Sequence, residues 1–218
     1  QIYLRHGITI QPGDCVFDDG ANIGLFTLFV QQTCPETTVY AFEPVPPTFE
    51  RLQANVEPYD DQVTIIPQGL SNQAETLEFT FYPEMSGVSG RFANPEQDKQ
   101  VAEAVLSNYD IDQVSQFVEE RYRSETYTCQ LTTVSDLMQQ YQVDQIDLLK
   151  RDVEKSELLV LEGIQPQDWP KIKQLTLEVE GAKMLEQVCQ LLESHGYRLE
   201  IDDYVVSSDT QAPMAGLY

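Results

Sequence analysis

Short apolar runs of strand length alternate along the chain with stretches in which apolar residues recur at helical spacing. Apolar runs bounded by turn residues predict strands, and apolar positions three and four apart predict amphipathic helices. The expected strands are 15–18, 38–42, 63–67, 76–82, 146–149, 172–178, 197–201 and 213–218. The expected helices between them are 23–32, 48–56, 134–142, 158–163 and 184–195. This alternation indicates an α/β domain built on a parallel sheet with crossover helices.

The pattern changes between residues 84 and 128, where glycines and a proline precede polar stretches of helical period around 101–106 and 114–122. This region has too few apolar residues to form a core of its own. We therefore expect a single domain over residues 1–218, with 84–128 inserted into it as a lid.

Composition narrows the possible partners. The chain has 218 residues, with 13 Lys and Arg against 36 Asp and Glu, so its formal net charge is −23. Such a charge argues against nucleic acid and against an acidic membrane surface as partners. No apolar run approaches the roughly 18 to 20 residues that cross a bilayer, so no membrane span is expected.

Cysteine and histidine usage limits the chemistry further. The cysteines occur singly, at Cys15, Cys34, Cys129 and Cys189. Without a Cys-x-x-Cys pair they are typical of buried thiols in a reducing compartment, so we expect a cytoplasmic location. The only histidines are His6 and His195, which excludes sites that need several imidazoles. A general base here is therefore expected to be a carboxylate.

A glycine-containing turn follows the first expected strand. The run VFDDGANIG, from Val16 to Gly24, ends a strand in acid and turns into a helix. Such a turn lets backbone N–H groups and a helix N-terminus approach a ligand closely. The glycines lie at Gly20 and Gly24 with Asn22 between them, so the dinucleotide pattern Gly-x-Gly-x-x-Gly is not met. A tight turn without a ligand stays the alternative.

Two further acidic sites follow strands that are expected to end at the same edge of the sheet. Glu43 ends the second strand, where an acid can accept both hydroxyls of a ribose. Together, Glu43 and the glycine-containing turn indicate a nucleoside ligand. After the strand at 146–149, the period of two places Lys150, Asp152 and Glu154 on one side. Burying like charges costs several kcal/mol without compensation, which favours function, although capping of the next helix explains part of the cluster.

Three long stretches resemble FkbM-type methyltransferases, a branch of the class I S-adenosylmethionine-dependent enzymes. They are DDGANIGLFTLF at 18–29, VYAFEPVPPTFERLQANV at 39–56 and IDLLKRDVEKSELLVLEGI at 146–164, in the family's order. The resemblance implies a Rossmann-like class I methyltransferase fold: a mostly parallel seven-stranded sheet with helices on both faces and an inserted helical lid on the acceptor side. The stretch YPEMSGVSGRFA at 82–93 resembles O-methyltransferases of bacterial polyketide and nonribosomal peptide assembly lines. Since the chain opens at Gln1 rather than Met, we expect an excised domain of such a protein.

The resemblance also implies roles for individual residues. S-adenosyl-L-methionine is the expected cofactor and S-adenosyl-L-homocysteine the product. The cofactor-binding positions, from methionine turn to ribose to adenine, are Asp18, Gly20, Asn22, Gly24, Glu43, Gln68 and Ser71. Asp152 and Glu154 match the acidic pair that faces the methyl-transfer region. The loop 85–90 would close over cofactor or acceptor.

Two departures from the family pattern affect the chemistry. Asp19 and Arg151 are charged where many relatives carry hydrophobic residues, and a salt link between them is conceivable. The family commonly ends its next strand with Glu-Val-His, whereas the run from Leu177 to Gly181 is LEVEG and has no histidine. Glu180 then stands where the imidazole would take the acceptor proton.

The expected catalytic residues are therefore Asp152, Glu154, Glu180 and Lys150. A buried carboxylate with a raised pKa would remove the proton of a hydroxyl, and Lys150 would orient a carboxylate or stabilise developing oxyanion character. Binding of Mg²⁺ by the three carboxylates is an alternative role, but helix caps and acid-base groups account for the same residues, so no metal is expected.

The expected function is O-methylation of a natural-product intermediate tethered to an acyl carrier protein or lipid-like, with the carrier or neighbouring megasynthase domains as partners. Arg121 and Arg123 are candidates for docking, and a solvated helical face is their alternative. A noncatalytic domain that binds cofactor or a partner without turnover is the main alternative function, because the histidine is missing. A nicotinamide-dependent oxidoreductase fits less well, since the glycine spacing disagrees and no Tyr-x-x-x-Lys pair stands out.

Overall fold

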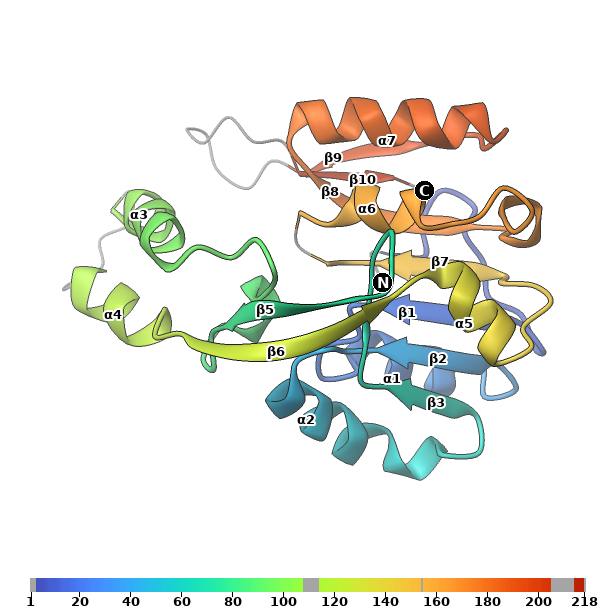
Figure 1. Cartoon of the computed structure of the whole chain (residues 1–218), viewed down its shortest axis with the longest axis horizontal. Coiled ribbons are helices and arrows are strands. Elements are labelled where there is room, and N and C mark those ends of the chain that lie inside the picture. The colour runs from blue at the N-terminus through green and yellow to red at the C-terminus, as the bar shows by residue number, and fades with distance from the viewer. Residues whose placement is uncertain (1–2, 108–113, 154, 205–213, 218) are drawn as a thin grey trace.

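A seven-stranded sheet forms the centre of the protein (Figure 1). The computed structural model describes residues 3–107, 114–153, 155–204 and 214–217. In sheet order the strands are β3 (Val63–Ile66), β2 (Thr38–Phe42), β1 (Cys15–Asp19), β7 (Leu148–Arg151), β8 (Leu175–Glu180), β10 (Met214–Leu217) and β9 (Ile201–Tyr204). The first five pair in parallel, and β10 is antiparallel to both of its neighbours. The expected mostly parallel seven-stranded sheet is confirmed.

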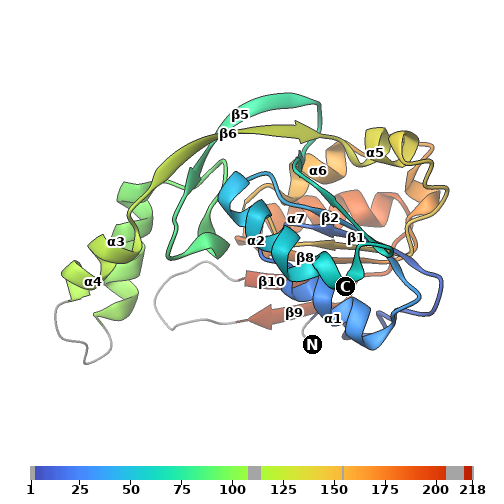
Figure 2. The same ribbon diagram turned by 90° about the horizontal axis from the view of Figure 1, so that it is seen from below.

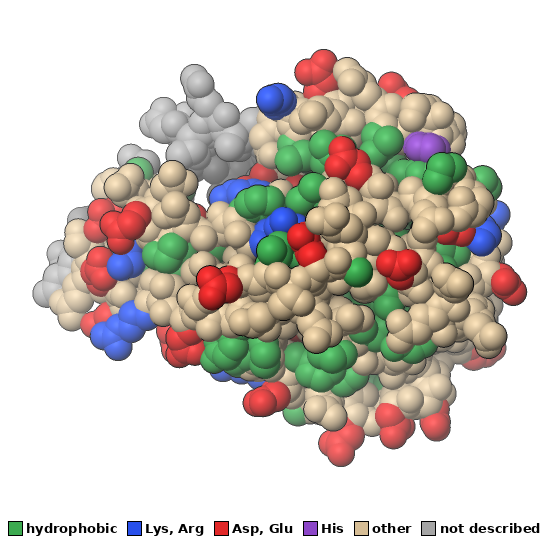
Figure 3. Space-filling view, viewed as in Figure 1, with side chains coloured by type: hydrophobic (Ala, Val, Ile, Leu, Met, Phe, Trp, Pro, Cys, Tyr) green, Lys and Arg blue, Asp and Glu red, His purple; other side chains and the backbone are tan. Residues whose placement is uncertain are grey.

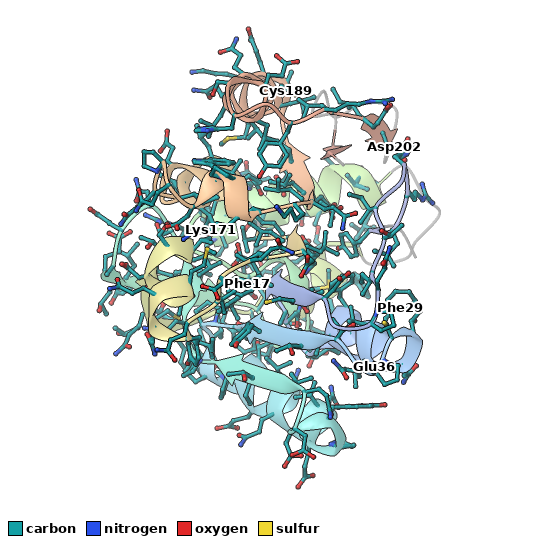
Figure 4. All side chains as sticks on the ribbon, turned by 90° about the vertical axis from the view of Figure 1, so that its right-hand side faces the viewer. Phe17, Phe29, Glu36, Lys171, Cys189 and Asp202 are labelled. Atoms are coloured by element: carbon teal, nitrogen blue, oxygen red, sulfur yellow. The ribbon has the colours of Figure 1, made fainter. Side chains whose placement is uncertain are left out.

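Helices cover both faces of this sheet (Figure 2). On one face lie α1 (Leu25–Thr33) and α2 (Pro46–Val56), and on the other α5 (Val134–Gln140), α6 (Glu157–Glu162) and α7 (Ala182–Ser194). Alternate strand residues supply the two cores, because successive side chains point to opposite faces. In β1, Val16 packs beneath α1 and α2, whereas Phe17 packs against the other helices and lies near the centre of the view in Figure 4.

A second, three-stranded sheet carries the helices of the inserted region. It consists of β4 (Gly69–Leu70), β6 (Glu125–Thr132) and β5 (Glu75–Phe81), in that order. The long antiparallel pair of β5 and β6 extends away from the body, with α3 (Pro95–Leu106) and α4 (Val114–Arg121) at its outer end (Figures 1 and 2). Strand β6 is absent from the sequence-based expectation, because its alternating Thr, Tyr, Cys and Leu residues follow directly on the polar insertion.

Two strands continue further than the hydrophobic pattern predicts. Strand β7 was expected to end at Leu149 but includes Lys150 and Arg151, and β8 extends to Glu180. Charged residues normally mark the end of a strand, but Lys150 and Arg151 stay in the sheet because each faces an aspartate of β1 in the neighbouring register. The expected strand at 197–201 is wrong, since β9 begins only at Ile201.

The surface matches the composition. Acidic side chains are scattered over the face seen in Figure 3. All four cysteines are free thiols, and Cys34 and Cys129 are buried. No helix in the described part of the chain is long and apolar enough to cross a membrane.

Candidate functional site

A cavity of about 350 Å³ lies where the central strands end. Its lining includes residues that follow β1, β2 and β7, both residues of β4, and Glu178 of β8. In open α/β sheets, ligands bind in the crevice outside the carboxyl ends of the strands. The cavity therefore occupies the position where a ligand is expected.

The turn after β1 needs glycine for steric reasons. Gly20 has φ +75° and Gly24 has φ +89°, the left-handed region that glycine adopts without cost. A Cβ atom at Gly20 would clash with the carbonyl oxygen of Asp152, and one at Gly24 would lie 2.8 Å from Leu52 of α2. Gly20 and Asn22 line the cavity, whereas Gly24 packs beneath α2.

Two buried ion pairs join β1 to β7 just before this turn. The register places Asp18 opposite Lys150 and Asp19 opposite Arg151. Lys150 Nζ lies 3.0 Å from Asp18 Oδ1, and Arg151 Nε lies 3.2 Å from Asp19 Oδ2. Because adjacent residues point to opposite faces of a sheet, one pair lies on each face. The salt link conceived between Asp19 and Arg151 is present.

The Asp18–Lys150 ion pair contacts the glycine turn through a hydrogen bond from Lys150. Asp18 is fully buried and accepts a hydrogen bond from Thr27 Oγ1 at 2.6 Å, so it lies beneath the cavity lining. Lys150 Nζ also donates to the carbonyl oxygen of Gly20 at 3.0 Å. Burial alone lowers the pKa of Lys150, but the charges of Asp18 and Asp152 raise it above its ordinary value. Lys150 therefore keeps its positive charge beside the cavity.

The Asp19–Arg151 pair connects the turn to α6. The Arg151 guanidinium donates to the backbone carbonyl oxygens of Ser156 and Glu157 at the start of that helix. Burial raises the pKa of Asp19 to about 6, although Arg151 and Lys150 both act to lower it. Arg151 thus holds the loop from β7 to α6, which supplies Asp152 and Ser156 to the cavity.

Glu43 follows β2 and lines the cavity, as its predicted contact with a ribose requires. Its side chain is buried, and Oε1 accepts a hydrogen bond from the N–H of Val45 at 2.8 Å. Burial raises the pKa of this carboxyl to about 7, against the lowering effect of that bond and of Lys150. An acid in this state gains stabilisation from hydroxyl groups that donate to it.

The residues expected near adenine lie differently from the others. Gly69 and Leu70 line the cavity, while Gln68 and Ser71 on either side of them do not. Ser71 is buried, and its Oγ accepts a hydrogen bond from Arg91 Nη1 at 3.1 Å. Arg91 also pairs with Glu75 at 3.3 Å and itself lines the cavity. Ser71 therefore contacts the cavity only indirectly, through its hydrogen bond to Arg91.

The acidic residues expected to be catalytic separate in the structure. Asp152 lines the cavity, and its Oδ2 accepts a hydrogen bond from the Tyr3 hydroxyl at 2.7 Å. Glu180 is half-buried on β8 and lies outside the cavity lining, and Glu154 lies outside the described residues. Among the described residues, no three His, Cys, Asp or Glu side chains are arranged to hold a metal ion.

Glu178 is a cavity residue that the sequence reasoning missed. It lines the cavity, and burial together with the charges of Asp152 and Glu180 raises its pKa to about 7. The signal was present in the run LEVE, because a period of two places Glu178 and Glu180 on one face while Leu177 and Val179 enter the core.

The fold is that of a Rossmann-like methyltransferase. A solved FkbM methyltransferase from Methylobacillus flagellatus KT superposes with a TM-score of 0.61 at 16% identity, covering 99% of this chain and 46% of that one. A family model for the methyltransferase FkbM domain matches residues 18–199, and the chain belongs to this family.

Two named relatives are similar to most of this chain. The chain is 37% identical over 201 residues to the 31-O-demethyl-FK506 methyltransferase FkbM of Streptomyces tacrolimicus, covering 89% of this chain and 76% of that protein. It is 33% identical over 217 residues to the AMB antimetabolite synthetase AmbE of Pseudomonas aeruginosa, covering 92% of this chain. The match spans only 10% of the length of AmbE.

Proposed function

We propose that the chain is an S-adenosylmethionine-dependent O-methyltransferase that acts on a hydroxyl of a natural-product intermediate held by a carrier protein. The observation that carries the proposal is the cavity at the carboxyl ends of the strands, in which buried Glu43 and the turn at Gly20 meet. The names of the two relatives support a hydroxyl acceptor and an assembly-line setting.

The cavity residues fit this cofactor. Glu43 would accept the ribose hydroxyls, and the backbone at Gly20 and Asn22 would border the methionine part. Gly69 would let the adenine approach the backbone closely. A Cβ atom at this position would lie only 2.7 Å from Leu131. When bound, the cofactor supplies an electrophilic methyl group on a positively charged sulfur.

The remaining work of this chain is to orient the acceptor hydroxyl, exclude water and take up its proton. Among the carboxylates Asp152, Glu154, Glu178 and Glu180, we favour Glu178 as the proton acceptor. It lines the cavity, and a pKa of about 7 matches a base that works near neutral pH. Lys150, held by Asp18, keeps a positive charge nearby for developing negative charge on the acceptor oxygen.

We expect the partner to be an acyl carrier protein, in the cytoplasm where free thiols persist. Arg121 and Arg123 border one surface hollow with Glu84, Glu120 and Glu125. Arg121 pairs with Glu84 at 3.9 Å, so the basic charge at this place is partly neutralised. Docking of an acidic carrier there would depend on Arg123 more than on Arg121.

Isothermal titration with S-adenosylmethionine, S-adenosylhomocysteine and NADH tests the cofactor assignment. We expect binding of the first two only. Glu43→Ala should weaken it by about 1–3 kcal/mol, because the ribose hydroxyls lose a charged acceptor. Glu36→Ala is the control, because Glu36 is exposed and lies before β2, at the opposite end of the strand from Glu43. This variant should bind as the wild type does.

If Glu43→Ala binds S-adenosylmethionine as tightly as the wild type does, Glu43 does not contact the ribose. If the wild type binds neither S-adenosylmethionine nor S-adenosylhomocysteine, the proposed function is wrong. Transfer of a labelled methyl group to hydroxyacyl carrier proteins then tests turnover. Cofactor binding without transfer to any of them would favour the noncatalytic alternative that the missing histidine raises.

A further inference from the structure

A separate cavity, of about 520 Å³, lies at the opposite end of the central sheet from the site described above. In Figure 1 the parallel strands point to the left, so their amino ends lie on the side that faces the viewer in Figure 4. The lining of this cavity includes the residues that lead into β8 and begin it, from Ile172 to Leu175, so we call it the amino-end cavity. Among the described residues, none lines both this cavity and the one that contains Glu43. The proposed methyl transfer therefore assigns no role to it.

Apolar side chains form the inner wall of the amino-end cavity. They come from four segments: the one before β1, η3 (Trp169–Lys171) with the residues that follow it, the end of α7, and the segment before β9. A volume of several hundred Å³ and a mainly apolar lining are typical of sites for small molecules. The buried apolar residues are Trp169, Ile172, Leu175, Leu177 and Leu192, and the partly buried ones are Ile8, Tyr197 and Leu199.

The end of α7 fixes the shape of this wall. His195 directly follows the helix, and its ring stacks on Trp169 with centroids 4.0 Å apart and 9° between the ring planes. Gly196, at φ +86°, then turns the chain. The Tyr197 hydroxyl donates hydrogen bonds to the carbonyl oxygens of Ile172 at 2.7 Å and Trp169 at 3.2 Å. These contacts hold the wall in place without a ligand.

The charge around the amino-end cavity has the opposite sign to that of the whole chain. The chain has 13 Lys and Arg against 36 Asp and Glu, whereas the lining has Lys173 and Arg198 against a single carboxylate, Glu200. Both histidines of the chain, His6 and His195, also line the cavity. In a molecule with a net charge of −23, a local excess of positive charge attracts an anion that the rest of the surface repels.

Lys173 is the cation that can receive such an anion. Arg198 pairs with Glu200 at 2.7 Å, and His6 pairs with Asp202 at 2.8 Å. Lys173 is exposed and forms no ion pair within the described part of the chain, where its hydrogen bond is a long one of 3.5 Å to a backbone carbonyl oxygen. Its ammonium group therefore lies beside the apolar wall without a carboxylate partner among the described residues.

We propose that the amino-end cavity binds a small aliphatic carboxylate, with the hydrocarbon chain against Leu175, Leu192 and Leu199 and the carboxylate on Lys173. The lining is mostly aliphatic, which favours a hydrocarbon chain over a ring system. Burial of the chain supplies the affinity, and the charge of Lys173 selects the acid over a neutral molecule of the same length. Because this cavity and the methyl-transfer site have separate linings, the inference does not depend on the proposed function.

Trp169 provides a direct measurement, because it is the single tryptophan of the chain and lies in the wall of this cavity. Fluorescence titration with octanoate and with 1-octanol at pH 7.5 compares two chains of the same length with and without the charge. We expect octanoate to change the fluorescence saturably and to bind more tightly than 1-octanol. It should also raise the melting temperature with increasing concentration, since a ligand of the folded state stabilises that state.

Lys173→Met removes the charge and keeps an unbranched apolar side chain. It should weaken octanoate about 2- to 5-fold, the range of an exposed ion pair, and leave the affinity for 1-octanol unchanged. Lys183→Met, at an exposed position of α7 outside the cavity lining, is the matched control and should change neither affinity. Leu199→Phe places a larger side chain in the cavity and should weaken both ligands.

The outcomes decide each part of the proposal. If Leu199→Phe weakens octanoate but Lys173→Met does not, the cavity takes an uncharged molecule and the carboxylate assignment is wrong. If octanoate does not saturate, or binds all variants equally, the amino-end cavity is not its site and the proposal is overturned. Melting temperatures without ligand verify that the variants are folded, and the exposed Lys173→Met decides the question even if Leu199→Phe does not fold. None of these titrations uses S-adenosylmethionine, so their failure leaves the proposed function untouched.

Discussion

Glu178 and Glu180 lie two residues apart on one face of β8, yet their surroundings differ. Glu178 lines the cavity at the carboxyl ends of the strands, and the charges of Asp152, Glu180, Glu157 and Lys150 act on it. Glu180 lies one strand period further on and outside that lining. The position along β8, rather than the residue type, therefore decides which of the two carboxylates reaches the cavity.

Glu178→Gln is expected to lower kcat for methyl transfer to a hydroxyacyl carrier protein about 100-fold or more, the usual contribution of a general base. Its affinity for S-adenosylhomocysteine should stay within about threefold, since the substitution keeps the shape of the side chain. Glu180→Gln, on the same strand face, is the matched control with a smaller expected loss. The reverse order of the two kcat values would assign the proton transfer to Glu180.

The sequence predicts those site residues that lie at the ends of β1, β2 and β7. Gly20, Asn22, Glu43 and Asp152 could be found because a strand, a turn and an acid follow each other locally. Tyr3 and Arg91 could not, because their contacts with Asp152 and Ser71 join segments far apart in sequence.

At the scale of elements, the junction of β1 and β7 is the most highly charged part of the core. Asp19 and Arg151 are both fully buried, and neither Asp19 oxygen has a hydrogen-bond partner in the described part of the chain besides its ion pair with Arg151. Buried ion pairs often contribute little net stability, but removal of one partner leaves an uncompensated charge. This junction also joins the glycine turn to α6, so its stability concerns the cavity directly.

Arg151→Leu is therefore expected to lower the free energy of unfolding by about 3–5 kcal/mol, as measured by urea denaturation at pH 7.5. The double variant Asp19→Leu/Arg151→Leu removes both charges from the same apolar surroundings and should recover much of that loss. If the double variant is as unstable as the sum of the two single ones, the two residues do not act as a pair. Arg198→Leu, in an exposed pair with Glu200, is the control and should change stability little.

Helices and strands could be predicted from the sequence where buried residues recur at a regular spacing. They could not be predicted where charged or polar residues interrupt that spacing. Strand β2 was predicted at Thr38–Phe42, as observed, because turn residues bound an apolar run. Strand β6 was missed because most of its first residues are exposed, and its pairing partner β5 lies more than 40 residues earlier. Register with a distant strand, rather than local hydrophobicity, holds it in place.

At the scale of the whole molecule, acidic groups dominate both the surface and the cavity. The net charge of −23 creates a negative field around the chain, which opposes ionisation of any further carboxyl inside it. Among the described residues, Asp19, Glu43, Glu157 and Glu178 are buried or half-buried carboxyls for which burial outweighs the nearby cations and raises the pKa. Ionisation of the carboxyls that line this cavity therefore destabilises the folded state.

This opposition predicts how stability depends on pH. The pKa values are about 6 for Asp19 and about 7 for Glu43 and Glu178, above the ordinary values of 3.8 and 4.5. Between the ordinary and raised values the folded chain holds more protons than the unfolded one, so the free energy of unfolding falls as pH rises from about 4.5 to about 7. Urea denaturation across this range should show the decrease.

Glu43→Gln identifies the source of that dependence. The amide stays neutral at every pH, so the variant should gain about 3 kcal/mol over the wild type at pH 8 and little at pH 4, where Glu43 is mostly protonated in both states. Added salt should stabilise both proteins at pH 8 through screening of the surface charge, without removing the difference between them, because buried groups are screened less. An equal gain at both pH values would instead show that the amide improves packing, and the buried charge of Glu43 would then not be what lowers stability.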